Sequence, residues 1–253
     1  MALIYNSANE TKVIGAQALR QFATPAPLGR FHKPTPFVDF AELVEHRLGR
    51  QFDIALSEYA VSKDGNKMFG MIELAPLEGE LITADEWRMQ IGVRSSHDQS
   101  LQTGLTMGTR VLVCSNLCFT GDIGRWDTKN TTYKMDRLPL LVEDAVAKLP
   151  QFIQREGARR DAYKLRELKP RIGDAALVEV YRRGGLTSAQ LGRAIDQWHE
   201  PEHAEHAQDG HNVWRAWNAV TEALKPTGAN NNMELVRQRS MVATKFFDEV
   251  VGL

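Results

Sequence analysis

The spacing of apolar residues along the chain changes its period several times. From Phe37 to Leu48 the apolar positions fall at helical intervals, and Gly49 follows them. Residues 37–48 are therefore predicted to form an amphipathic helix that ends at this glycine. The preceding stretch, residues 24–37, carries four prolines and is expected to form an extended loop.

Beyond Gly49 apolar and polar residues alternate, which is the period of a β-strand. We predict a strand from about residue 52, a hairpin turn at Lys63-Asp64-Gly65-Asn66, and strands at 67–75 and 86–94. In the last strand, one side carries Trp87, Met89, Ile91 and Val93, and the other carries Arg88, Gln90, Gly92 and Arg94. This alternation predicts one dry face and one cationic face.

The four residues Ser95-Ser96-His97-Asp98 offer side-chain oxygens directly before a helix-compatible run, residues 99–113. We interpret them as the N-cap of a helix. Gly104 and Gly108 are four residues apart in that run, so they suggest close packing against a sheet or a second chain. Residues 118–135 are turn-rich and β-leaning, and could form a hairpin.

From Leu138 onward the pattern is helical, with Pro150 expected to kink or divide the first helix. Four further helices are predicted, at about 172–183, 187–199, 211–225 and 232–251. The predicted class is α+β: an antiparallel sheet with a β-β-β-α core preceded by a helix, plus a helical C-terminal half. The expected parts are an extended segment (1–37), an α+β core domain (38–136) and a helical region packing on the core (137–253).

Composition narrows the function classes only slightly. Of the 253 residues, 43% are hydrophobic, and 31 basic residues nearly balance 32 acidic ones, so no global field favours nucleic acid or a membrane. We find no secretory signal or membrane-spanning run, which predicts a cytoplasmic protein without a membrane partner. Cys114 and Cys118 are interpreted as small core residues, with a redox pair as the alternative.

Three segments together resemble a phage/plasmid-like family of unknown function. They are RSSHDQSLQTGLTMGTRVLVCSN (94–116), GGLTSAQLGRAIDQWHEP (184–201) and HNVWRAWNAVTEALK (211–225). The chain departs from the family pattern at Gln99 and Leu117, where the family has Gly. The resemblance implies a role in a mobile element within a bacterial host, in replication, recombination or conflict with the host.

The predicted order of elements in residues 37–113 is a helix, three antiparallel strands and a helix. This order resembles the core of the single-strand annealing superfamily, whose members form rings or filaments on DNA. The resemblance implies that single-stranded DNA would lie in a cationic groove between the sheet and the adjacent elements.

Nucleic-acid binding requires cations for phosphates and aromatic faces for bases. The candidates before the C-terminal half are Lys63, Lys67, Arg88, Arg94, Arg110, Arg125, Trp126, Lys129, Tyr133 and Lys134. The densest basic stretch, 155–171, adds Arg159 and Arg160. The alternative interpretation is that these are solvated positions on a balanced surface.

Two other constellations invite chemistry. His199, His203, His206 and His211 have spacings that could bring imidazoles to one Zn²⁺ ion, but Pro201 separates His199 from the others, and a solvated linker is the preferred interpretation. The Ser-His-Asp run at 95–98 invites a hydrolase hypothesis, with a turn and helix cap as the simpler alternative. Neither a phosphate-binding loop nor a dinucleotide fingerprint occurs, and no cofactor or catalytic residue is predicted.

The leading functional prediction is non-catalytic binding of single-stranded DNA in phage or plasmid recombination or replication. The protein is expected to act as a homo-oligomer assembled through the Gly104/Gly108 helix or the C-terminal helices. The alternatives are an interaction protein that blocks or recruits a host protein, and a metal-dependent hydrolase.

Overall fold

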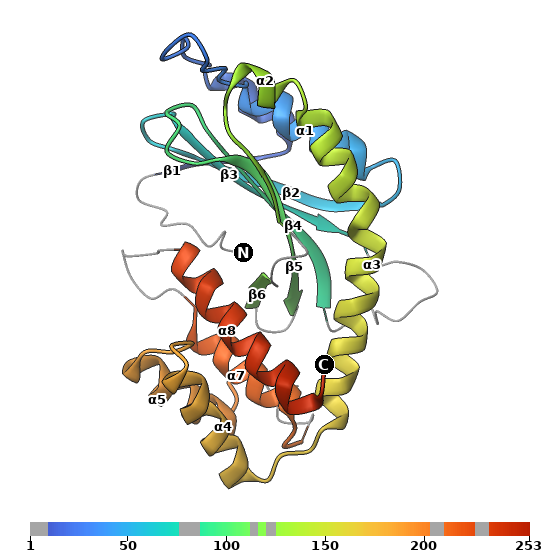
Figure 1. Ribbon diagram of the computed structural model, residues 1–253, viewed down its shortest axis with the longest axis vertical. Coiled ribbons are helices and arrows are strands. Elements are labelled where there is room, and N and C mark those ends of the chain that lie inside the picture. The colour runs from blue at the N-terminus through green and yellow to red at the C-terminus, as the bar shows by residue number, and fades with distance from the viewer. Residues whose placement is uncertain (1–9, 76–86, 112–115, 120–124, 203–209, 226–232) are drawn as a thin grey trace. The chain divides into compact units, whose positions relative to one another are not determined.

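The computed structural model describes residues 10–75, 87–111, 116–119, 125–202, 210–225 and 233–253 (Figure 1). The chain divides into two compact units. The first comprises Met1–Gly79, Arg88–Gly108 and Asp122–Phe152, and the second comprises Glu80–Trp87, Thr109–Gly121 and Ile153–Leu253. The fold is of the α+β class, as the sequence predicts.

An antiparallel sheet forms the first unit, with the strand order β1-β2-β3-β4-β5 and with β7 also paired to β5. The strands are β1 (Glu10–Ile14), β2 (Ile54–Ser62), β3 (Lys67–Leu74), β4 (Trp87–Ser96), β5 (Thr103–Val111) and β7 (Arg125–Thr128). The β2–β3 turn is the predicted one, and hydrogen bonds from Ser62 and Asn66 lower the pKa of Asp64 to about 2.

One face of this sheet is covered by helices. Figure 1 shows α1 (Phe37–Leu48) and the N-terminal part of α3 (Leu138–Leu165) on the same side of the strands. The Tyr59 hydroxyl of β2 donates to Glu45 of α1 over 2.8 Å. A side chain at Gly70 would meet the Tyr59 ring at 2.3 Å, so the glycine leaves room for that ring to lie across β3.

The predicted dry face of β4 is confirmed, because Met89, Ile91 and Val93 are buried. The opposite face is less cationic than predicted. Gln90 there is buried and donates to Glu73 over 2.9 Å, and Arg94 pairs with a carboxylate of β7.

The helix predicted at 99–113 is wrong, because residues 103–111 form strand β5. Thr103, Leu105 and Met107 are buried on one side of this strand, and residues 103–106 pair with β7. A side chain at Gly104 would lie 2.2 Å from the Trp126 carbonyl oxygen. This glycine therefore does mark close packing, but the packing is between two strands. The helix predicted to assemble the oligomer is not formed, because its residues belong to β5.

Of the residues expected to cap that helix, Ser95 and Ser96 end strand β4, and His97 and Asp98 begin the turn to β5. Gln99 adopts a positive φ of 63° there, in the left-handed region that glycine enters at no steric cost. A residue other than glycine in this conformation carries a local conformational cost.

The predicted hairpin at 118–135 is also replaced by another arrangement. The two strands in this region, β6 (Asn116–Phe119) and β7, each neighbour β5, and the segment ends in the short helix α2 (Thr132–Met135). Cys114 lies outside the described residues, and nothing is described of the Cys118 side chain.

The second unit confirms the four predicted C-terminal helices within two residues at each end. It contains the end of α3, which continues through Pro150 undivided, together with α4 (Pro170–Arg182), α5 (Ser188–His199), α7 (Val213–Ala223) and α8 (Met233–Val251). The start of α5 is fixed by a capping box between Thr187 and Gln190. Asn212 caps α7 by accepting from the Arg215 backbone N–H.

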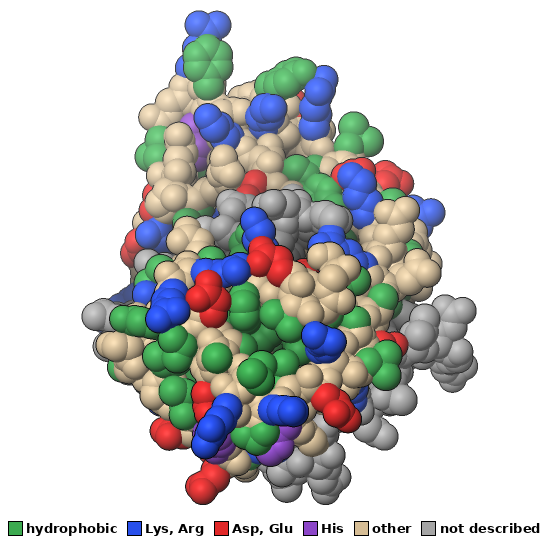
Figure 2. All heavy atoms as spheres, turned by 60° about the horizontal axis from the view of Figure 1, so that its bottom comes forward, with side chains coloured by type: hydrophobic (Ala, Val, Ile, Leu, Met, Phe, Trp, Pro, Cys, Tyr) green, Lys and Arg blue, Asp and Glu red, His purple; other side chains and the backbone are tan. Residues whose placement is uncertain are grey.

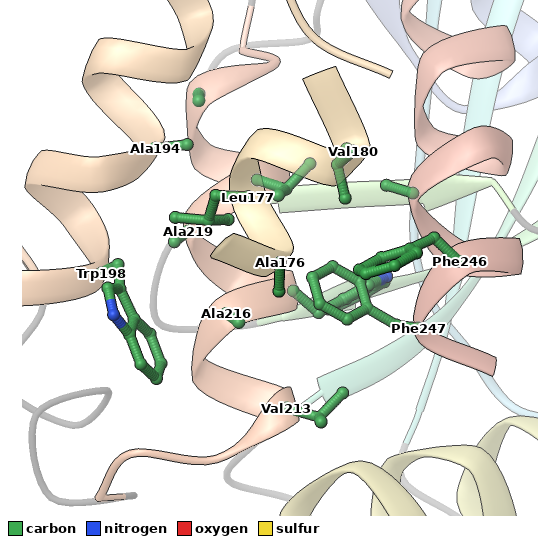
Figure 3. Close-up of a cluster of buried hydrophobic side chains, with 14 of the residues drawn as sticks. Ala176, Leu177, Val180, Ala194, Trp198, Val213, Ala216, Ala219, Phe246 and Phe247 are labelled. Carbon is green, nitrogen blue, oxygen red and sulfur yellow. The ribbon is translucent and has the colours of Figure 1, made fainter. Parts of the chain in front are cut away.

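Aromatic and aliphatic side chains from these helices fill a shared core (Figure 3). Trp198 is fully buried, and a side chain at Gly173 would meet its indole at 2.2 Å. Trp214 and Trp217 are buried as predicted, and their rings stack with centroids 5.2 Å apart. Among the described helices, none has the length and apolar character needed to span a membrane.

Candidate nucleic-acid interface

Several connecting segments of the first unit meet at one end of the sheet. The register places the end of β2 (Ser62), the start of β3 (Lys67) and the end of β4 (Ser96) next to one another. Thr103, at the start of β5, is opposite Thr128 at the end of β7. Thus the two turns and the segment after β7 all leave the sheet at this end.

The proline-rich segment before α1 is hydrogen-bonded to the segment that follows β7. His32 and Thr131 form a backbone bridge. The Lys33 N–H donates to the Asn130 carbonyl over 3.1 Å, and the Thr132 N–H donates to the Phe31 carbonyl over 3.0 Å. Two stretches about a hundred residues apart in the sequence are therefore held side by side.

This pairing creates an exposed surface of rings and cations. Phe31 is 69% exposed and Tyr133 is 61% exposed. The Arg30 guanidinium lies 5.4 Å from the centre of the Phe31 ring, and that of Arg137 lies 4.5 Å from the centre of the Tyr133 ring. At the upper end of Figure 2, Lys and Arg side chains stand beside exposed aromatic rings. We call Arg30, Phe31, Lys33, Lys129, Tyr133, Lys134 and Arg137 the aromatic-basic surface.

The charge of this surface is mainly positive. It carries five cations, of which Lys33 pairs with the exposed carboxylate of Asp136 over 2.6 Å. Lys129, Lys134 and Arg137 are exposed, and no ion pair involving them occurs within the described part of the chain. These three side chains are free to contact an anionic partner.

A buried polar network fixes the surface to the sheet. The Thr103 hydroxyl donates to Asn130 Oδ1 over 2.6 Å, and the Asn130 amide donates to the Ser96 carbonyl. Ser95 and Thr103 share a further hydrogen bond of 2.7 Å. All of these side chains are buried, so the segment after β7 has a defined position before any ligand binds.

The Ser-His-Asp run serves this anchoring and does not form a catalytic triad. The His97 ring stacks on Phe37 with centroids 3.8 Å apart, and its Nε2 lies 3.0 Å from the Thr35 carbonyl oxygen. Asp98 accepts hydrogen bonds from Ser100. The imidazole is therefore committed to the segment before α1, and the hydroxyl of Ser96 bonds to the Leu101 backbone.

The state of His97 makes the anchoring sensitive to pH. Burial lowers the pKa of His97 and the neighbouring His32 acts in the same direction, while the Thr35 hydrogen bond and Asp98 oppose them. The unfolded chain takes up a proton near pH 6.5, where the folded chain does not. The contribution of His97 to the free energy of unfolding is therefore fully present above about pH 6.5, and it is lost as the pH falls toward the lower folded-state pKa of His97.

We expect the melting temperature of the wild type to fall between about pH 7.5 and about pH 5.5, and that of His97→Gln to fall less over the same interval. Glutamine retains a donor for the Thr35 carbonyl but does not titrate. The exposed His46 of α1 supplies the control variant, His46→Gln. Thermal unfolding across this pH series checks the expectation, and parallel slopes for the wild type and His97→Gln would contradict it.

Four of the predicted cations lie at this end of the sheet. Lys129 and Lys134 belong to the aromatic-basic surface. Lys63 is exposed in the β2–β3 turn, and Lys67 begins β3 beside the carboxylates of Asp64 and Asp98, whose pKa values it helps to lower. Three residues that the sequence analysis singled out, Lys129, Tyr133 and Lys134, thus belong to the aromatic-basic surface.

The other predicted residues of the sheet are placed differently. Arg94 forms a two-pronged ion pair with Asp127, both contacts being 3.1 Å. The Trp126 indole donates to Asp144 of α3 over 2.7 Å. Arg88 lies eight residues before Ser96 in β4, which is about 26 Å along a strand. Arg110 and Arg125 lie on β5 and β7, and nothing is described of the side chains of Arg88, Arg110 and Arg125.

The basic stretch of α3 has a structural role at Arg159. This side chain is buried and bonds to Glu156 and Asp248, so it offers no donor to a phosphate. Arg160 pairs with Asp161 over 2.8 Å. Both residues belong to the second unit.

The histidine constellation is only partly described. His199 bonds to Asp174 over 2.7 Å, and His211 packs edge-on against Trp198 with ring centres 4.9 Å apart. His203 and His206 lie outside the described residues. Over the ranges that the structure covers, no group of three potential metal-ligating side chains occurs.

Four members of the surface escaped sequence analysis: Arg30, Phe31, Lys33 and Arg137. Phe31 and Arg30 lie in a stretch without apolar period, where a lone aromatic residue has no inward-facing neighbours to pack with. That isolation is the signal that could have identified them, since an aromatic ring outside any periodic element is free to be exposed.

Comparison with known proteins adds no relative: no family model, curated protein or solved structure matches the chain.

Proposed function

We propose that the protein binds single-stranded nucleic acid, with single-stranded DNA as the expected ligand, through the aromatic-basic surface. The observation that carries the proposal is the pair of exposed rings, Phe31 and Tyr133, each accompanied by an arginine, on two segments that are hydrogen-bonded to each other.

Exposed rings suit unpaired bases. A base that is not stacked in a duplex can stack on an aromatic side chain, and such stacking contributes about 1–3 kcal/mol per base without sequence preference. Exposed apolar side chains that gather in one patch with a polar rim can mark a binding site. Arg30 and Arg137 can extend the stacking platform through their planar guanidinium groups.

The cations suit the sugar-phosphate backbone. Lys129, Lys134 and Arg137 are exposed and make no ion pair within the described residues, so no internal bond has to break for them to contact phosphate. Because the chain as a whole is nearly neutral, binding depends on this local set of cations and is expected to weaken steeply with salt.

A titration of fluorescein-labelled oligo(dT) with the protein tests the proposal. We expect saturable binding at low salt, with micromolar or tighter affinity, and a slope of log K against log salt of about −0.7 for each phosphate contacted. Binding that is absent at low salt would refute the proposal. A stoichiometric complex with a host protein that survives nuclease treatment would instead favour the interaction-protein alternative.

Reversing two charges should change the salt dependence in a defined way. For Lys129→Glu/Lys134→Glu we expect weaker binding and a slope that is smaller by about 1.4, since two phosphate contacts are lost. Lys245→Glu, at an exposed position of α8, measures the effect of a charge change outside the surface. The same slope for the wild type and the double variant would show that these lysines do not contact phosphate.

A further inference from the structure

A second polar site lies in the first unit, at the C-terminal end of α1. A pocket of about 220 Å³ opens there against α3, lined by Arg47, Arg50, Gln51, Glu143, Val146 and Ala147. It shares no residue with the aromatic-basic surface. Its lining brings two arginines, one glutamine and one glutamate to one small space.

Among the described residues, neither arginine has an ion-pair partner. Arg47 Nε is buried without a hydrogen-bond acceptor. Within the described residues, neither Arg47 nor the exposed Arg50 has an ion pair that would have to break when an anion enters the pocket.

The chemistry of the lining defines the ligand. Two guanidinium groups match the geometry of a phosphate, which accepts paired N–H bonds. Their charge exceeds that of Glu143 together with the partial negative charge at the end of α1. Glu143 and Gln51 can accept hydrogen bonds from hydroxyl groups, and Val146 and Ala147 provide an apolar wall. The volume lies below that of pockets for drug-sized ligands, so the pocket can enclose a phosphate and a small substituent, and any larger part of the ligand lies outside it.

We infer that this pocket binds a phosphomonoester with a small hydroxylated substituent. Arg47 and Arg50 bind the phosphate, and Glu143 accepts from a hydroxyl. The phosphate can belong to a free metabolite or to the terminus of a nucleic-acid strand, because both present the same dianionic group next to a hydroxylated carbon skeleton.

Thermal unfolding of the full chain with inorganic phosphate and with glycerol 3-phosphate tests the inference, against sodium chloride at the same ionic strength. At roughly five times the dissociation constant, we expect the melting temperature to rise by about 2–4 °C. Arg50→Gln, at an exposed position where folding is not at risk, should abolish the rise, and so should Arg47→Gln. Arg155→Gln, an exposed arginine of α3, should retain it.

A rise that is equal in sodium chloride, or that Arg50→Gln retains, overturns the inference. Oligo(dT) with and without a 5′-phosphate distinguishes the two sources. A preference for the phosphorylated oligonucleotide that Arg50→Gln removes assigns the pocket to a strand terminus, whereas stabilisation by glycerol 3-phosphate without that preference assigns it to a metabolite. Lys129→Glu/Lys134→Glu should keep its response to phosphate, so failure of nucleic-acid binding would not be mistaken for failure of the pocket.

Discussion

Replacing Arg159 with leucine is expected to lower the free energy of unfolding by about 3–5 kcal/mol, because it leaves the buried carboxylate of Glu156 and the partly buried carboxylate of Asp248 without their cation. The guanidinium is 6% exposed and bonds to Glu156 of its own helix and to Asp248 of α8, with Nε–Oδ1 and Nη2–Oδ2 distances of 2.8 and 3.2 Å. Tyr163 contacts Asp248 over 2.8 Å.

The protonation states support the same picture. Burial alone would lower the pKa of Arg159, but Glu156 and Asp248 more than offset this effect and hold it above its ordinary value. Burial and the Asp248 carboxylate raise the pKa of Tyr163. The network therefore stays fully charged at Arg159 across the accessible pH range, and it ties α8 to α3.

Urea-induced unfolding of Arg159→Leu beside Arg155→Leu measures the effect. Arg155 is exposed four residues earlier on the same helix, so its replacement should change stability by no more than about 0.5 kcal/mol. If the two variants were equally stable, the buried network could not be what holds these helices together.

Removing both exposed rings is expected to produce the largest loss of nucleic-acid binding. In Phe31→Ala/Tyr133→Ala two stacking contacts of about 1–3 kcal/mol each disappear, which corresponds to an affinity loss between about 30-fold and about 10⁴-fold. Because both side chains are largely exposed, the folding stability should remain within about 0.5 kcal/mol of the wild type.

Two variants separate stacking from general loss of apolar surface. Tyr133→Phe keeps the ring and should bind like the wild type, whereas a requirement for the hydroxyl would reduce its affinity. Leu140→Ala truncates a side chain of α3 that is 67% exposed and lies outside the surface. Fluorescence anisotropy with oligo(dT) measures the affinity of each variant. If the double alanine variant bound as tightly as Leu140→Ala, the two rings would not contribute to binding.

The helices were predictable because their signals are local and repeated. α1 has its predicted bounds, since its apolar period and the glycine that follows agree. In the second unit, the capping residues Thr187 and Asn212 reinforce an apolar period of several turns. The β2–β3 turn is equally local, since Asp64 and Gly65 form it with neighbours in sequence.

Strand β5 could not be identified in this way. A spacing of four residues, as between Gly104 and Gly108, places two residues on one side of a helix and also on one side of a strand. Pairing with a strand that is distant in sequence favours the strand conformation here: β7 pairs with residues 103–106 and requires the close approach at Gly104. Pairing between strands that are distant in sequence cannot be predicted from the pattern of neighbouring residues.

The residues of the candidate site also differ in whether local sequence or distant contacts place them. Lys129 and Lys134 stood out because they are close in sequence to an aromatic residue. Phe31 joined them only through backbone hydrogen bonds with residues about a hundred positions away. Arg159, in contrast, looked like a surface cation because it lies in a basic stretch, and its carboxylate partner Asp248 is 89 residues distant.

The most direct test of the aromatic-basic surface is photo-crosslinking of the wild-type protein to single-stranded DNA that contains 5-bromodeoxyuridine, followed by mass spectrometry of the peptides. Stacked rings react with the adjacent modified base, so we predict crosslinks at Phe31 and Tyr133, and their loss at high salt. Crosslinks confined to other segments, or none at a salt concentration where binding is saturated, would contradict the account.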